Sequence, residues 1–155
     1  MIWLSDKQIN YLHCELIKAT GGSDGIRDDN LLQAALLSPL QTYNSVALFP
    51  STIEKAVRLA CGLTQNHPFI DGNKRIGAHA MLVTLKLNSI SLSFTQQELS
   101  GIFLRLAASE ISFAELNVWV HSHLSVQKIY SFYRYKKRGA YTALVFKFQI
   151  IFYFR

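Results

Sequence analysis

Nine consecutive residues, from His67 to Arg75, carry the side chains that a phosphate-handling site needs. They read His-Pro-Phe-Ile-Asp-Gly-Asn-Lys-Arg. His67 belongs to the residue type that titrates near neutrality, so it is suited to take a proton from an attacking hydroxyl group. Asp71 offers a hard carboxylate oxygen, which suits a magnesium ion that stays bound to phosphates. The stretch therefore predicts a nucleotide-phosphate site with its own general base.

The residues after Asp71 predict an anion site at the start of a helix. Apolar segments with helical periodicity flank the stretch, so a loop runs directly into a helix N-terminus, where free N–H groups and the helix dipole favour an anion. Gly72 permits close approach of the backbone, and Asn73 is a typical turn residue. Lys74 and Arg75 add charge-assisted bonds to phosphate. An arginine at a helix start opposes the dipole, and a bound anion would relieve that conflict.

Capping boxes predict where four helices start. In this pattern a hydroxyl side chain and a Glu or Gln three residues later satisfy each other's backbone N–H groups. Each box precedes apolar residues at helical spacing. The boxes begin at Ser5, Ser51, Thr95 and Ser112. Gly21-Gly22 ends the first helix, and Asp28 or Asp29 caps a further short helix that stops before Pro39.

The helix expected over residues 73–88 is mostly apolar beyond its first turn. Ile76, Ala80 and Val83 mark one face, while Gly77 and Ala78 leave little polar surface elsewhere, so we expect this helix to be buried all round. The sequence thus favours an all-α bundle around a central helix. Residues 41–50 mix strand and turn formers, which fits a short hairpin and an ordinary connecting loop equally well.

Composition separates the last 31 residues from the rest. The chain has 155 residues, of which 50% are hydrophobic and 17% charged, as in a globular protein. Residues 125–155 hold seven Lys and Arg and no acidic residue, which leaves a net charge of −1 for residues 1–124. We therefore divide the chain into a domain at 1–124 and a C-terminal extension at 125–155, and we expect no direct DNA binding by the domain.

The extension is rich in aromatic as well as basic residues. Its composition favours strand, or a helix before Gly139 and a strand after it. Its apolar segment from Ala143 to Phe154 is too short, and too interrupted by Lys147, to span a bilayer. It fits a patch that binds single-stranded nucleic acid or a membrane surface, and it fits an extension without a function of its own, which we favour.

The cysteines and the N-terminus indicate a cytoplasmic protein. Cys14 and Cys61 lie far apart with no C-x-x-C spacing, so we expect neither a disulfide nor a zinc site, but two buried thiols. The N-terminal residues lack the basic and apolar regions of a signal peptide.

Residues 67–75 resemble the signature of the Fic/Doc family, H-P-F-x-D/E-G-N-G/K-R. Lys74, where most of these proteins have a second glycine, is similar to the death-on-curing (Doc) toxin branch. The resemblance covers about residues 1–124 and implies the all-α Fic fold, with a short flap that pairs with an extended segment of the target. Further motifs in the family's order are Gly21-Gly22, Gly25 through Asp28, Leu31-Leu32, Ala34-Ala35, Pro39 and Leu48-Phe49-Pro50.

The resemblance also implies an activity. It indicates the toxin of a toxin–antitoxin pair, which uses ATP and magnesium to transfer the terminal phosphoryl group to a hydroxyl of a protein, with elongation factor Tu as the known target class. In this scheme His67 is the general base, Asp71 binds magnesium, and the nucleotide phosphates are held by Gly72, Asn73, Lys74 and Arg75. No S/T-x-x-x-E-G/N inhibitory helix occurs in the sequence, so inhibition should come from a separate cognate antitoxin.

Two alternatives stay open. The first is AMP transfer: Gly72 matches the ordinary Fic pattern where the phage-type Doc pattern has alanine, although Ala78 replaces the second arginine of many AMP-transferring relatives. The second is an inactive Fic-like binding module that acts through its basic, aromatic extension.

The remaining residues near the motif have structural interpretations. Phe69 and Ile70 should anchor the loop in the core, and Arg27-Asp28 should form a pair or a helix cap. His79 is expected to be a packed helix histidine, and His13 lies at no metal-binding spacing.

Overall fold

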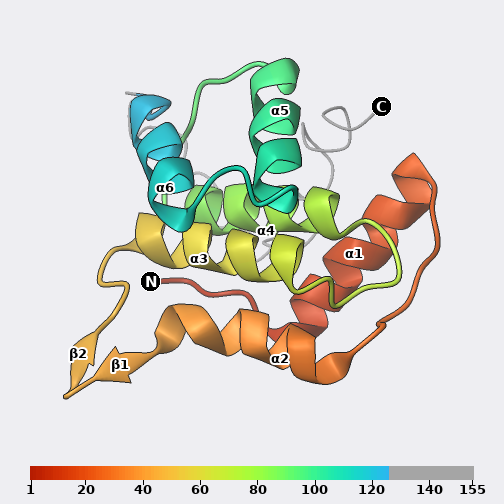
Figure 1. The fold of residues 1–155 in the computed structure, drawn as a ribbon, viewed down its shortest axis with the longest axis horizontal. Coiled ribbons are helices and arrows are strands. Elements are labelled where there is room, and N and C mark those ends of the chain that lie inside the picture. Colours follow the sequence, from red (N-terminus) through yellow and green to blue (C-terminus); the bar gives the residue numbers. More distant parts are fainter. Residues whose placement is uncertain (126–155) are drawn as a thin grey trace, which may run out of the picture.

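Every predicted capping box starts a helix in the computed structural model, which describes residues 1–125 (Figure 1). In each box the hydroxyl accepts from the backbone N–H three residues on, and the Glu or Gln reaches back. The all-α prediction is confirmed. The elements are α1 (Asp6–Thr20), α2 (Asp29–Leu37), the 3-10 turn η1 (Ser38–Leu40), β1 (Thr42–Tyr43), β2 (Val46–Ala47), α3 (Thr52–Gln65), α4 (Asn73–Leu87), α5 (Gln96–Ala107) and α6 (Phe113–Ser122).

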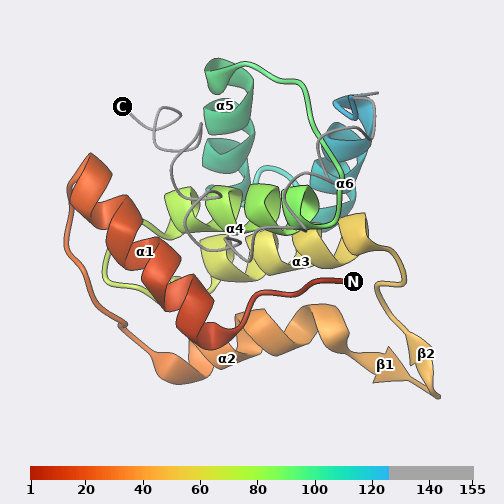
Figure 2. The same ribbon diagram turned by 180° about the vertical axis from the view of Figure 1, so that it is seen from behind.

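Helices α3 and α4 lie side by side between two layers of helices. Figures 1 and 2 show α1 and α2 on one side of this pair and α5 and α6 on the other. Ala78, Met81 and Leu85 of α4 belong to the apolar core shared with α5 and α6. Ile76 and Ala80 belong to a second core, shared with α1 and α2. Because both faces of α4 pack on a core, the helix is buried all round, as its sequence predicted.

The structure shows which residue ends α1 and which residue caps the start of α2. Gly21 ends α1, and its N–H donates to the Ile17 carbonyl. Asp28, rather than Asp29, caps α2: its carboxylate accepts from the N–H groups of Asn30 and Leu31 at 2.9 and 3.2 Å.

Residues 42–47 form a hairpin, the first of the two structures that the sequence allowed. Strand β1 pairs antiparallel with β2, with Thr42 opposite Ala47. The two turn residues, Asn44 and Ser45, have positive φ of 48° and 65°, which matches the twist of a two-residue hairpin.

Two cations of α3 hold the base of this hairpin. Lys55 donates to the Phe49 carbonyl, and Arg58 donates to Ser38 Oγ at 2.7 Å while its guanidinium lies 5.8 Å from the Phe49 ring centroid. The tip stays open to solvent, since Tyr43 is 71% exposed. The hairpin is thus fixed at its base and free to contact another molecule at its tip.

His79 is a packed helix histidine, as expected. Its side chain is buried, and its Nδ1 has no hydrogen-bond partner among residues 1–125. Burial lowers the pKa of His79 to about 4, because the charged imidazolium would lose its hydration.

We expect His79 to make the protein acid-sensitive. Its folded pKa lies below the value of the unfolded chain, so between pH 6.5 and 4 the unfolded state binds the extra proton and stability falls as pH falls. The change His79→Leu should therefore raise the free energy of unfolding at pH 5 by about 2 kcal/mol and change it little at pH 8. Urea denaturation at the two pH values measures both. An equal gain at both would show that packing, and not protonation, is responsible.

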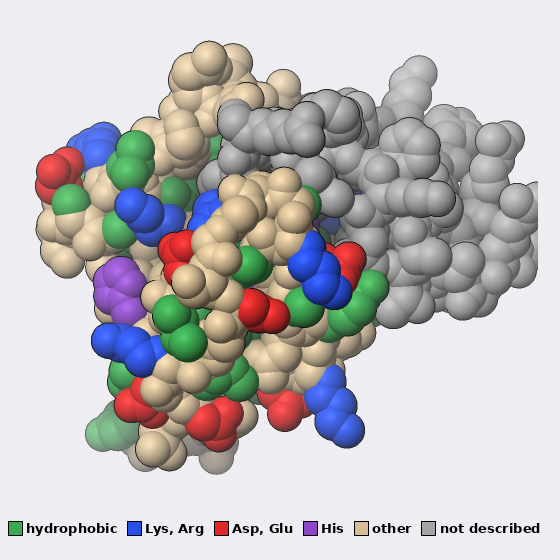
Figure 3. Space-filling model, turned by 90° about the vertical axis from the view of Figure 1, so that its right-hand side faces the viewer, with side chains coloured by type: hydrophobic (Ala, Val, Ile, Leu, Met, Phe, Trp, Pro, Cys, Tyr) green, Lys and Arg blue, Asp and Glu red, His purple; other side chains and the backbone are tan. Residues whose placement is uncertain are grey.

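The surface and the cysteines complete the description. Basic and acidic side chains lie interspersed over the described part of the face in Figure 3. Within residues 1–125, no helix has the length and apolar character needed to cross a membrane.

Cys14 and Cys61 are free thiols; Cys61 is buried as expected, but Cys14 is only half-buried. The predictions made for residues 126–155 lie outside the described residues.

Candidate functional site

The loop between α3 and α4 carries His67 on the surface and Phe69 in the core. His67 is exposed and has a positive φ of 51°, which turns the chain sharply after α3. Phe69 is 1% exposed, but Ile70 is 58% exposed, so the prediction that both anchor the loop was wrong for Ile70. The reason is that this stretch is extended: Phe69 pairs with Ile26 in an antiparallel bridge, and side chains of successive extended residues point to opposite sides.

Arg27 holds the His67 turn through backbone carbonyls. Its Nε donates to the His67 carbonyl at 2.7 Å and its Nη2 to the Asn66 carbonyl at 3.0 Å. Its own N–H donates to the Pro68 carbonyl at 2.7 Å. Of the two expected interpretations of Arg27-Asp28, the helix cap holds for Asp28, whereas Arg27 fixes the loop that presents His67.

Asn73, the first residue of α4, closes the loop from the other end. Its Oδ1 accepts from the Phe69 N–H and its Nδ2 donates to the Phe69 carbonyl, both at 2.9 Å. The side chain is buried, so these bonds are shielded from water. Asn73 therefore shapes the loop from behind.

Gly72 is the N-cap of α4, in the left-handed conformation at φ 76°. That conformation favours glycine, and the space is also tight, because a Cβ here would lie 3.0 Å from Ile17 Cδ1. Gly72, and not Asp71, is therefore the N-cap residue of α4. Within residues 1–125 no side chain caps this helix, and no acidic residue lies in its first turn, so the positive N-terminal end of the helix is available to another partner.

Asp71 presents an ionised carboxylate beside that helix end. The carboxylate accepts from the Gly72 N–H and pairs with Arg75 at 3.3 Å. The Gly72 N–H and the Arg75 charge hold the pKa of Asp71 below its usual range. Its side chain is 48% exposed, so a cation can reach it.

The donor set around Asp71 fits magnesium in one specific way. Within residues 1–125, no three His, Cys, Asp or Glu side chains are arranged to hold a metal ion by themselves. Magnesium keeps several waters and is often bound by one or two carboxylates together with substrate phosphates. Asp71 could therefore hold magnesium together with a nucleotide, but not as an all-protein cage.

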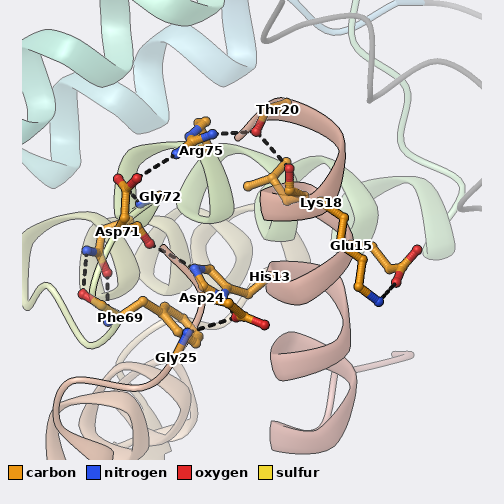
Figure 4. A network of polar contacts seen from close by, with 12 residues as sticks. His13, Glu15, Lys18, Thr20, Asp24, Gly25, Phe69, Asp71, Gly72 and Arg75 are labelled. Atoms are coloured by element: carbon orange, nitrogen blue, oxygen red, sulfur yellow. Dashed lines mark hydrogen bonds and ion pairs between the residues drawn. The ribbon is translucent and has the colours of Figure 1, made fainter. Parts of the chain in front are cut away.

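The two cations of the motif differ in the number of contacts that they make. Arg75 donates to Thr20 Oγ1 and to Asp71 (Figure 4). It also donates to the Gly21 carbonyl at 2.8 Å. Its charge thus lies at the C-terminal end of α1, where cations are favourable, and this contact offsets its unfavourable place at the start of α4. Lys74 is exposed, and no partner is seen for it within the described chain, so it is available to an incoming anion.

Gly22 leaves room for the Asp71 carboxylate. A Cβ at Gly22 would lie 2.2 Å from Asp71 Oδ2 and 3.0 Å from Arg75 Nη2, and the residue has φ 117°. The role of this glycine is not evident from the sequence, because the group it accommodates lies on a distant segment.

We expect Gly22→Ala to be more harmful than Gly21→Ala. Both glycines have positive φ, so each change should cost about 1–3 kcal/mol of backbone strain. Nothing lies within 4 Å of a Cβ at Gly21, whereas Gly22→Ala must also displace Asp71. Urea denaturation of both variants isolates this collision as the difference between them. Equal losses would show that the strain alone matters.

Comparison with known proteins decides the family. A sequence model of the Fic/DOC family matches residues 3–85, just over half of the chain. The chain belongs to the Fic/DOC family. The match includes α1, the loop that carries His67, and α4 as far as residue 85. The chain is also similar to the protein Toxin Doc of Mycolicibacterium smegmatis, with 37% identity over 75 residues. That alignment covers 48% of this Fic/DOC chain and 58% of its relative.

Proposed function

We propose that this protein is the toxin of a toxin–antitoxin pair, and that it transfers the terminal phosphoryl group of ATP to a hydroxyl of a protein. Membership of the Fic/DOC family and the similarity to a protein named Toxin Doc support this proposal. Elongation factor Tu is the first target to test, since it is the target class that the Doc-like motif implies. The same resemblance implies a cognate antitoxin as partner and the cytoplasm as the place of action.

The observation that carries the proposal is the start of α4, where, among residues 1–125, no side chain caps the helix and no partner is seen for Lys74. The first turn of α4 has no side-chain cap and no acid, and Lys74 is exposed beside it. A helix N-terminus with an adjacent cation attracts phosphate. His67 and Asp71 lie on the loop that leads into this turn, so a general base and a carboxylate both flank the proposed phosphate position.

In the proposed reaction, His67 takes the proton of the attacking hydroxyl as its oxygen bonds to the terminal phosphorus and ADP leaves. Lys74, Arg75 and the N–H groups of the first turn of α4 stabilise the charge that develops on the phosphoryl oxygens. Magnesium, bound by Asp71 and the nucleotide, would neutralise part of the phosphate charge.

One observation favours phosphoryl transfer over AMP transfer, and a second removes an argument for AMP transfer. Ala78, which stands in place of the second arginine of many AMP-transferring relatives, is fully buried in the core shared with α5 and α6, where a cation would be unpaired. Gly72 supports AMP transfer only if glycine is needed at this position for the reaction with the nucleotide. A Cβ there would press on Ile17, so local packing is sufficient reason for the glycine.

Intact-mass analysis tests the proposal. Elongation factor Tu is incubated with the protein, ATP and magnesium, and the variant His67→Ala is run in parallel. A gain of one phosphate that the variant does not produce supports phosphoryl transfer. A gain of one AMP that depends on His67 would show that the nucleotide binds in the other orientation. Absence of any gain contradicts the assignment of this target.

Truncation after Ser125 separates the enzyme from a binding module. If toxicity in growing cells survives the truncation but not His67→Ala, the extension is dispensable and the enzyme proposal holds. If toxicity is lost on truncation but survives His67→Ala, the protein acts by binding through residues 126–155.

A further inference from the structure

His13 of α1 lies directly behind the loop that carries the motif, and the proposed reaction does not use it. Its side chain is 1% exposed, although histidine is polar at both ring nitrogens. Figure 4 shows the imidazole between Asp24 on one side and Asp71 on the other. Buried polar side chains are usually hydrogen-bonded, and the two partners of His13 indicate what it holds in place.

One ring nitrogen of His13 bonds the backbone of Asp71. Nε2 lies 2.8 Å from the Asp71 carbonyl oxygen. A carbonyl oxygen only accepts, so Nε2 carries the proton and donates it in this contact. The N–H of the same peptide unit belongs to Gly72, and it donates to Asp71 Oδ1 at 2.5 Å. The imidazole, the peptide unit and the Asp71 carboxylate therefore form one continuous chain of hydrogen bonds, in which each bond polarises the next.

The orientation of the imidazole is fixed on its other sides. Nδ1 faces Asp24 Oδ1 at 3.1 Å. The ring stacks on Phe69, with centroids 3.9 Å apart and planes 10° apart. A Cβ at Gly72 would lie 3.4 Å from Nε2, so the glycine allows the loop to approach the ring closely. With these contacts the ring has little freedom to turn, so its hydrogen bond can hold the Asp71 carbonyl in one position.

We infer that His13 is a positioning residue that holds the Asp71 carboxylate in the orientation required for magnesium. The inference rests on the proposed function, because it takes Asp71 as the magnesium ligand. Residues that orient a metal ligand affect metal affinity although they do not touch the metal. The segment after α1 lies against the same carboxylate, where Gly22 leaves it room.

Two amide variants separate the contacts of His13. The amide nitrogen of His13→Gln lies about where Nε2 lies in histidine, so it can still donate to the Asp71 carbonyl. The amide of His13→Asn is one methylene shorter, so it reaches toward Asp24 but not Asp71. We expect His13→Asn to weaken binding of manganese in the presence of ATP by about 10–100-fold. His13→Gln should keep most of the affinity for manganese.

Manganese binding is measured by electron paramagnetic resonance on the full chain, with Asp71→Ala as the reference without the carboxylate. The amide signal of Gly72 in a ¹H–¹⁵N spectrum gives a second readout that needs no metal. Displacement of this signal in His13→Asn and its return in His13→Gln would show that His13 sets the hydrogen bond at Asp71. Thermal unfolding verifies that each variant is folded.

The outcomes separate the inference from the proposed function. The inference is supported if His13→Asn weakens manganese binding and displaces the Gly72 signal, while His13→Gln keeps both close to those of the unmodified protein. Folded variants that both bind manganese with ATP as the unmodified protein does, or that are both equally weakened, overturn it. If Asp71→Ala binds manganese and ATP normally, the magnesium assignment of the proposed function fails. In that case a change in the Gly72 signal would leave His13 with a role in loop structure alone, which also overturns the inference.

Discussion

Replacing His67 with alanine should lower the rate of transfer by about 10²–10⁴-fold, which is the usual contribution of a positioned general base. The loop should keep its shape in this variant, because its hydrogen bonds involve the backbone of His67 and not its side chain: the carbonyl accepts from Arg27 at 2.7 Å. We therefore expect the thermal midpoint of unfolding to change little. Incorporation of labelled terminal phosphate from ATP into elongation factor Tu measures the rate.

His121→Ala provides the matched control for that experiment. His121 is also exposed, but it lies near the end of α6, remote in the fold from the loop between α3 and α4. The same chemical change there should leave the rate of transfer unchanged. A rate in His67→Ala that equals the rate in this control would remove His67 from the role of base. The resemblance to the family would then show the fold without the chemistry.

The features that the sequence predicted well are those whose cause lies within a few residues. A capping box joins a hydroxyl to a residue three positions on, so the starts of α1, α3, α5 and α6 could be placed from the sequence. Burial of α4 followed from the small number of polar residues beyond its first turn, because a helix with apolar residues on every side must be covered on every side.

The features that the sequence did not predict depend on contacts between distant segments. Arg27 donates to carbonyls of the His67 turn, and His13 donates to the carbonyl of Asp71. Every residue has a carbonyl group, so no pattern in the sequence identifies which one will be the partner. Ile70 shows the same limit: an apolar residue next to a buried phenylalanine turns outward because a bridge to residue 26 sets the alternation.

The glycine-rich segment after α1 has a structural role that its sequence motif did not indicate. In the sequence, Gly21 through Asp28 supports a family resemblance and predicts a helix stop and a cap. In the structure, the same segment lies against the loop between α3 and α4: Gly22 accommodates Asp71, and the Gly25 carbonyl accepts from the Ile70 N–H at 3.0 Å. The site is therefore assembled from two segments, and each holds the other in place.

The two ends of α4 offer a matched pair of asparagines that measures how much that assembly depends on burial. Asn73 bonds both the N–H and the carbonyl of Phe69. Asn88 bonds both the N–H and the carbonyl of Ile2, each at 2.8 Å. The hydrogen bonds to Phe69 are buried, whereas those to Ile2 are exposed to solvent. The two side chains thus make the same pair of bonds to a distant residue in different surroundings, and Asn88 Nδ2 also donates to the Thr84 carbonyl of its own helix.

Asn73→Ala should lower the free energy of unfolding by about 2–4 kcal/mol, because two buried backbone groups lose their partners and gain none. Asn88→Ala should cost only about 1 kcal/mol, since water replaces the lost bonds. Urea denaturation at neutral pH measures both. Asn73→Asp refines the test: its carboxylate can still accept from the Phe69 N–H, but it opposes the Phe69 carbonyl, so it should be no more stable than Asn73→Ala. Equal small losses at both ends of α4 would mean that the other contacts of the loop, among them those of Arg27 and His13, hold it without Asn73, and the activity of Asn73→Ala would then stay near that of the unmodified protein.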